Sequence, residues 1–123
     1  MSKRNPILLL NDIIESGNLI AEYTTEFEKF EDFISDRKTV DAVIRNFEII
    51  GEAANRLPEN FKNKHISIDW QRIRGFRNRV VHEYFGIDYE IVWRITKYFL
   101  PEMISELKQI FNSETGGVSD LYS

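Results

Sequence analysis

Ionisable and polar side chains are concentrated in residues 77–84, whose sequence is RNRVVHEY. Besides two arginines and an asparagine, the segment holds His82, one of two histidines in the chain, and Tyr84. Histidine exchanges protons near neutral pH, and arginine stabilises a phosphate whose negative charge rises in a transition state. An Arg–His pair therefore suits attack of a ribose 2′-hydroxyl on its own phosphodiester, a reaction that requires RNA and leaves a cyclic phosphate.

The composition argues against a metal centre beside this segment. Zinc is held by three or four ligands, and structural zinc sites are built mainly from cysteine and histidine. The chain has no cysteine and only two histidines, so it offers too few ligands for zinc. Carboxylates alone could still bind Mg²⁺, but no D-x-D pattern is present. We therefore predict chemistry that needs neither a metal nor another cofactor.

A helix through residues 70–84 would divide these groups between two faces, because each residue turns the helix by about 100°. Arg77 falls on the apolar face and His82 on a polar ridge, about 140° apart. They can act together if the helix unwinds before His82, near Gly86, or if a second copy supplies the missing group across a two-fold axis. The apolar face comprises Trp70, Ile73, Val80, Val81 and Tyr84, and the ridge comprises Arg74, Asn78 and His82, with Gly75 and Arg79 beside it.

The ridge is basic although the chain as a whole is acidic, with a net charge of −4. Four of the sixteen basic residues, Arg72, Arg74, Arg77 and Arg79, fall within eight positions. We expect Arg74 and Arg79 to contact RNA phosphates. Gly75 costs the helix about 1 kcal/mol relative to alanine, which predicts close approach of another backbone or of a ligand there.

Helices must position these groups, because apolar residues recur at three- and four-residue spacing along almost the whole chain. Asp69 and Asp88 are suited to cap the third and fourth helices, and Pro101 should kink the fourth near Lys97 and Tyr98. No strand alternation is present. The sequence thus predicts an all-α fold, an antiparallel four-helix bundle with an extra short helix. The predicted helices cover about 6–24, 37–57, 69–83 and 89–112, with a short turn at 27–33.

Length and composition bound the organisation of the protein. The chain has 123 residues, of which 42% are apolar and 29% charged, so we expect a single domain over 1–112 and a disordered polar tail over 113–123. A domain of this size gains from burying more surface in a dimer. We find no secretory signal and no apolar run long enough to span a membrane, and therefore expect a cytoplasmic protein without a membrane partner.

The pattern Arg77-Asn78-x3-His82-x-Tyr84 resembles the R-x4-H-x-Y motif of the HepT-like toxins, members of the HEPN superfamily. The resemblance spans about residues 6–112, although R-x4-H alone is a weak signal. One departure is Asp69, where relatives often carry proline; aspartate suits a first helical turn equally well. Further segments resemble the family in its order, namely IIGEAANRLP (49–58), IDWQRIRGFRN (68–78), VVHEYFGID (80–88) and VWRITKYFLPEM (92–103).

This resemblance implies a HEPN-like helical dimer whose two motifs face one cleft. It implies a metal-independent endoribonuclease that acts as the toxin of a type VII toxin–antitoxin system. By motif match, Arg77 and His82 would be the catalytic pair, and Asn78 would be the supporting polar residue. The family's antitoxin is an MntA-like nucleotidyltransferase, which would transfer AMP to Tyr84. A modified tyrosine must be accessible, whereas the helical period places Tyr84 on the core side; a helix ending near His82 would reconcile the two.

Two other functions compete with the ribonuclease. The chain could be a module that binds a nucleotide or a nucleotidyltransferase, with Arg77 and His82 holding phosphate without cleaving it. It could also be a structural dimer in which Arg77 forms a buried ion pair with Glu48 or Glu52. Substitution of His82 separates the three hypotheses. It would abolish cleavage by a ribonuclease, weaken ligand binding by a binding module, and change neither in a structural dimer. The other histidine, His65, belongs to no motif, and we expect a surface position for it in a loop.

Overall fold

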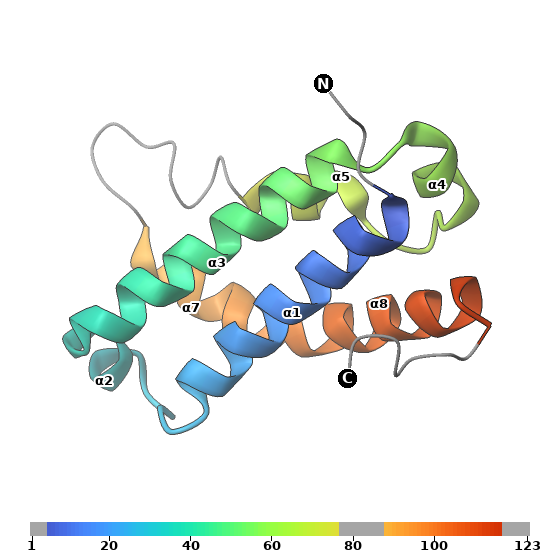
Figure 1. Ribbon diagram of the computed structural model, residues 1–123. Helices are drawn as coiled ribbons and strands as arrows, with labels where there is room; N and C mark the ends of the chain where they lie inside the picture. Colours follow the sequence, from blue (N-terminus) through green and yellow to red (C-terminus); the bar gives the residue numbers. More distant parts are fainter. Residues whose placement is uncertain (1–4, 77–87, 117–123) are drawn as a thin grey trace.

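The computed structural model describes residues 5–76 and 88–116, which form helices joined by short turns and loops, with no strand among them (Figure 1). The all-α prediction is thus confirmed, and the bounds of the first two long helices agree closely with it. The structure has two short extra helices, α2 and α4, where one was predicted. In chain order the elements are α1 (Pro6–Thr24), α2 (Phe30–Ser35), α3 (Arg37–Arg56), α4 (Glu59–Lys64), α5 (Trp70–Arg74), α7 (Tyr89–Arg94), the π-helical turn η1 (Ile95–Phe99) and α8 (Leu100–Glu114).

The helix starts are determined by local side chains. A side-chain carboxylate or amide oxygen accepts a hydrogen bond from a backbone N–H in the first turn of α1, α3, α5 and α7, at 2.8–3.2 Å. This bond satisfies one of the donors that a helix leaves unpaired at its start. The predicted caps at Asp69 and Asp88 are confirmed. The four capping residues are Asn5, Asp36, Asp69 and Asp88.

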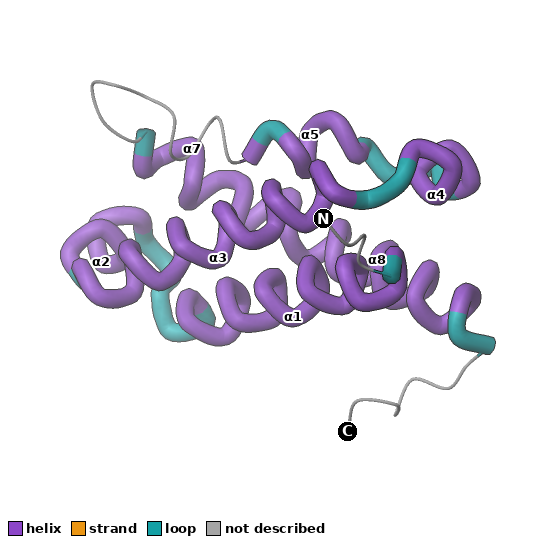
Figure 2. The backbone as a smooth tube through the Cα atoms, turned by 45° about the horizontal axis from the view of Figure 1, so that its top comes forward, coloured by secondary structure: helices purple, strands orange, loops and turns teal. Residues whose placement is uncertain are grey.

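The long helices α1 and α3 run antiparallel and side by side, with α8 against α1 and α5 against α3 (Figures 1 and 2). The short helices α2 and α4 lie at opposite ends of this arrangement (Figure 2). Aromatic and branched aliphatic side chains fill the space between the helices, and the largest fully buried ones are Phe33, Phe47, Phe76, Leu10, Ile13, Ile20, Ile50 and Ile73. Where the structure describes them, the connections between helices are short, which favours antiparallel neighbours in a helical bundle.

A glycine allows α1 to approach α8 closely. A Cβ added at Gly17 would lie 2.9 Å from Cγ1 and 3.1 Å from Cδ1 of Ile104. Both distances are shorter than ordinary van der Waals contact between carbon atoms. The absence of a side chain at Gly17 thus determines the spacing of the two helices, and the side chain of Ile104 fills the space.

The last long helix is interrupted where Pro101 was predicted to disturb it. Proline has no N–H to donate to the carbonyl of Lys97, so the regular α-helical pattern fails there. Instead, the N–H of Leu100 bonds to the carbonyl of Ile95, and η1 has one extra residue in its turn. This extra residue shifts the phase of the helix. Leu100 is fully buried, and the preceding residue, Phe99, is only partly buried.

Helix α8 continues to Glu114, two residues beyond the predicted end. Residues 117–123 of the predicted tail lie outside the described part of the chain, so the division into a domain and a disordered tail stays a prediction.

Candidate functional site

The candidate catalytic segment lies between two elements that the structure describes. Arg77, Asn78, Arg79, His82 and Tyr84 belong to residues 77–87, which lie outside the described residues. The structure does place the chain before them, from α5 to Phe76, and the chain after them, from Asp88 into α7. These two flanks fix where the segment leaves the described structure and where it returns.

Helix α5 forms the approach to the segment, and the core holds it by its apolar side. Asp69 caps it, with Oδ1 accepting a hydrogen bond of 3.0 Å from the N–H of Arg72. Trp70 and Ile73 are buried, as predicted from the apolar face. The indole Nε1 of Trp70 also donates a hydrogen bond of 3.0 Å to the carbonyl of His65, which ties α5 to the loop before it.

The predicted single helix over 69–83 is wrong in one respect, because α5 ends at Arg74. Gly75 caps the C-terminus, and its N–H bonds back to the carbonyl of Gln71 at 2.9 Å. A Cβ at Gly75 would lie 3.2 Å from that same carbonyl oxygen and 3.4 Å from that of Arg72. Among the described residues, the close neighbour of Gly75 is the preceding turn of its own chain; approach of a ligand stays a prediction.

Phe76 anchors the chain immediately before the candidate catalytic arginine. Its ring is fully buried. It packs edge-to-face against Phe47 of α3, with ring centroids 5.3 Å apart, and against Phe99 of η1, at 5.7 Å. Edge-to-face packing is a favourable geometry for aromatic rings. The path of the chain into Arg77 is thus determined by two elements distant in the sequence.

The two arginines of α5 line different grooves, because residues two apart on a helix point about 160° apart. Arg74, a predicted RNA contact, is exposed on a groove of about 400 Å³ beside α4. The side chain of Lys62, which is only 9% exposed, lines the same groove with its Nζ 3.9 Å from Oε1 of Glu59. The exposure that an RNA contact requires is present at Arg74, and a second cation, Lys62, lines the same groove.

Arg72 lines the second groove, which lies between α5 and the α7–η1 helix. Its guanidinium carbon is 4.0 Å from the ring centroid of Phe99, a cation–π contact that holds the charged group over the ring. Arg94 and Tyr98 line this groove as well. The sequence reasoning did not identify either residue, since the exposed position of Tyr98 depends on the π-helical turn.

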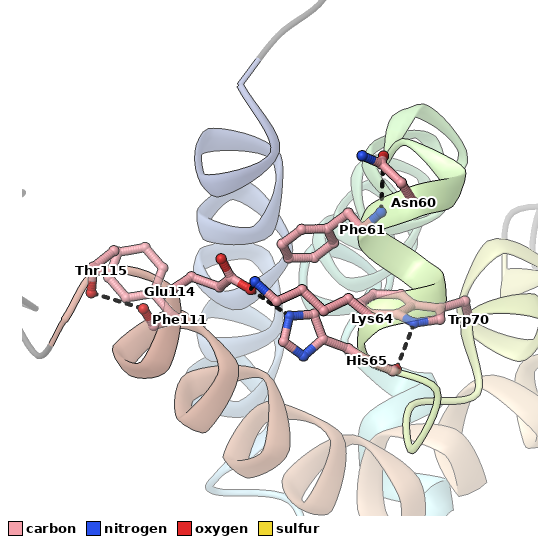
Figure 3. Close-up of polar contacts among 8 residues, drawn as sticks. All are labelled: Asn60, Phe61, Lys64, His65, Trp70, Phe111, Glu114 and Thr115. Carbon is pink, nitrogen blue, oxygen red and sulfur yellow. Dashed lines mark hydrogen bonds and ion pairs between the residues drawn. The ribbon is translucent and has the colours of Figure 1, made fainter.

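His65 is not the surface loop histidine that was predicted. Its Nε2 lies 2.6 Å from Oε2 of Glu114, at the end of α8, and both side chains are largely buried (Figure 3). Nζ of Lys64 lies 3.0 Å from the same carboxylate oxygen. The hydrogen bond with His65, followed by that with Lys64, lowers the pKa of Glu114. The partners are 49 residues apart, so no local pattern in the sequence could have revealed this contact.

Neither a metal site nor a membrane span is present in the described part of the chain. Residues 5–76 and 88–116 contain no group of three or more His, Cys, Asp or Glu side chains placed to hold a metal ion. In the same residues, no helix combines the length and the apolar character that crossing a membrane requires.

Comparison with known proteins gives consistent matches over most of the chain. Residues 13–110 match the family model described as "Ribonuclease HepT-like". The chain is 40% identical to "Probable ribonuclease HepT" of Thermococcus cleftensis over 108 residues, which cover 88% of this chain and 97% of the relative. It is 39% identical to "Putative RNase MJ0127" of Methanocaldococcus jannaschii over 116 residues, which cover 94% and 95% of the two chains. No solved structure matches significantly.

Proposed function

The chain belongs to the Ribonuclease HepT-like family, and from this we propose that it is a metal-independent endoribonuclease. The observation that carries the proposal is the complete Arg77-x4-His82-x-Tyr84 pattern, which falls inside the matched region 13–110. The ribonuclease names of the relatives support the same activity. A protein that only bound phosphate would not need a proton-transferring histidine beside the arginine.

In the proposed reaction, the 2′-oxygen of a ribose attacks the adjacent phosphorus atom. A new bond forms between the 2′-oxygen and phosphorus, and the bond between phosphorus and the 5′-oxygen of the next nucleotide breaks. His82 accepts the proton of the 2′-hydroxyl, and Arg77 stabilises the extra negative charge on the phosphoryl oxygens. Asn78 supports the pair as a hydrogen-bonding side chain. The products are a 2′,3′-cyclic phosphate and a 5′-hydroxyl, and the balance involves no metal ion.

The 5′-oxygen needs a proton as it leaves. The His82 that accepts the proton of the 2′-hydroxyl starts unprotonated, so it has no proton to donate to the 5′-oxygen at the same moment. A homodimer with two motifs in one cleft would provide a second His82 for this role. Light scattering at micromolar concentration should then give the mass of two chains. A monomer that is fully active would refute the shared cleft.

The decisive test is cleavage of single-stranded RNA in the presence of EDTA. Wild-type protein should cleave it and leave cyclic phosphate ends, which mass spectrometry of the fragments identifies. Arg77→Ala and His82→Ala should each lose the activity and keep their helical circular dichroism. His65→Gln, which removes the other histidine, is the matched control and should retain cleavage. Activity that appears only with added Mg²⁺ would refute the mechanism.

We further infer that the protein is the toxin of a type VII toxin–antitoxin pair, silenced by an MntA-like nucleotidyltransferase. The support is Tyr84, at the tyrosine position of the family motif. Its hydroxyl oxygen would attack the α-phosphorus of ATP, forming a phosphodiester and releasing pyrophosphate. The attached AMP adds a negative charge beside the motif arginines, where it would compete with RNA phosphate.

Incubation with the nucleotidyltransferase and ATP should add AMP to the wild-type protein and abolish its cleavage of RNA. Tyr84→Phe keeps the ring and removes the acceptor oxygen, so it should stay unmodified and active. Tyr98→Phe is the matched control, because Tyr98 is 80% exposed and thus an accessible acceptor outside the motif. An adduct that peptide mapping places on Tyr98, or on any residue other than Tyr84, would refute the assignment.

A further inference from the structure

The groove between α5 and the α7–η1 helix combines cations with an exposed aromatic ring. Its volume is about 560 Å³, and its lining includes Arg72, Arg94, Tyr98, Phe99 and Glu102. We call it the Tyr98 groove. With two arginines and one glutamate among these side chains, it is locally basic in a chain whose net charge is −4.

Tyr98 is 80% exposed, whereas every other aromatic side chain in the described part of the chain is buried or partly buried. The π-helical turn accounts for it. The extra residue in this turn lets Ile95 and Leu100, five positions apart, both enter the core, while Tyr98 between them points into solvent. Turns of this kind occur frequently at functional sites. The ring therefore offers a free face at a point where the helix departs from regular geometry.

The two arginines of the groove are available to a ligand. Arg94 is exposed and forms no ion pair within the described residues. Arg72 is exposed too, and its guanidinium is held over the Phe99 ring at 4.0 Å. This contact orients the group and leaves its N–H donors free to bind phosphate oxygens. Glu102 lies one helical turn beyond Tyr98.

The groove is lined by both of the described helices that flank the candidate catalytic segment in the chain. Arg72 lies on α5, which leads into Arg77, and Arg94 lies on α7, which follows the segment. Phe99, in the wall of the groove, packs against Phe76, the residue before Arg77. A nucleotide in this groove would therefore lie beside the described residues that lead into the motif and out of it.

We propose that the Tyr98 groove binds one nucleotide of single-stranded RNA next to the scissile site. The base stacks on the Tyr98 ring, and the backbone phosphate contacts Arg94 and Arg72. Stacking on an exposed aromatic ring tolerates any base, and arginine neutralises the phosphate. The assignment rests on the proposed ribonuclease function and adds to it a requirement for an unpaired base beside the cleavage site.

The test measures binding and cleavage separately. In the His82→Ala background, a labelled short single-stranded RNA is titrated by fluorescence anisotropy, and in the active background kcat and KM are measured. Tyr98→Leu keeps an apolar side chain but removes the ring, so the Kd and the KM should rise about 5-fold or more, in the range of one stacked base. Tyr98→Phe should behave like the wild type. Duplex RNA of the same sequence should bind equally to all three.

The charge of Arg94 is tested through the salt dependence of binding. Arg94→Gln should flatten the slope of log K against log salt by about 0.7, the value for one phosphate contact to a single strand. Lys108→Gln is the control, because it removes the same charge from α8, about 21 Å further along the helix. Its slope should match that of the wild type.

The outcomes separate this inference from the proposed function. If the wild type cleaves RNA but Tyr98→Leu has the same Kd and KM as Tyr98→Phe, the groove assignment is overturned and the proposed ribonuclease function stands. If Tyr98→Leu changes the molar mass measured by light scattering but leaves the Kd for RNA unchanged, the surface is a protein interface. This result would also overturn the groove assignment. Absence of cleavage by the wild type contradicts the proposed function, and the anisotropy titration still decides the groove.

Discussion

Replacing Phe76 with leucine should damage both stability and catalysis, because this ring joins the core to the candidate catalytic arginine. Leucine keeps most of the apolar volume but loses both edge-to-face contacts, with Phe47 at 5.3 Å and with Phe99 at 5.7 Å. Each such pair contributes about 0.5–1.5 kcal/mol beyond buried area, so the loss should be about 1–3 kcal/mol. A domain with about 5–15 kcal/mol of stability would remain folded.

The effect on catalysis follows from the covalent bond between Phe76 and Arg77. Without the Phe76 ring to hold the chain in one position, the Arg77 guanidinium can shift, and a misplacement of about 1 Å can cost about 100-fold in rate. We expect kcat of the folded variant to fall about 10- to 100-fold. Urea unfolding followed by circular dichroism gives the stability, and RNA cleavage at low urea gives the rate per folded molecule.

Phe33→Leu is the matched control for this experiment. Phe33 is also fully buried and has two aromatic neighbours, Trp93 at 5.1 Å and Phe27 at 6.4 Å, but it lies on α2, away from the chain that enters the motif. It should lose a similar free energy of unfolding and keep its rate per folded molecule. Equal losses of rate in both variants, or an unchanged stability of Phe76→Leu, would refute the anchoring role of Phe76.

Three further predictions concern the frame of the site. Gly17→Ala should lower the free energy of unfolding by about 1–2 kcal/mol, because overpacking against Ile104 at 2.9 Å exceeds the gain in helix propensity. In urea unfolding, the double variant with Ile104→Ala should lose less free energy than the two single variants added together. Simple additivity would contradict this. Glu114→Gln should be less stable than the wild type at neutral pH, and the difference should vanish as the pH falls below 4.5. The reason is that a carboxyl group with a lowered pKa stabilises the fold only while it is ionised. A stability difference that does not depend on pH in chemical unfolding would exclude this contribution of the carboxylate. Asp69→Ala should cost about 1 kcal/mol in thermal unfolding through loss of the α5 cap, while Asp69→Asn should cost little, and equal losses would argue against capping.

Local features of the sequence determined most of the helices. The periodic apolar residues of α1 and α3, the capping aspartates of α5 and α7 and the helix-disturbing Pro101 act on neighbours within one or two turns. A single sequence contains everything that such local interactions require. The motif segment likewise indicated the chemistry, because residue types and their spacing are properties of the chain itself.

Other features depended on contacts between distant parts of the chain. The ring cluster around Phe76 draws on α3 and η1, and the pairing of His65 with Glu114 joins residues 49 apart. The phase of the last helix changed because one extra residue in η1 moved Leu100 into the core and left Phe99 at its edge. The Tyr98 groove exists only because α5 packs beside this irregular turn. Packing selects among alternatives of similar local energy, and it does so through partners that helical periodicity cannot identify.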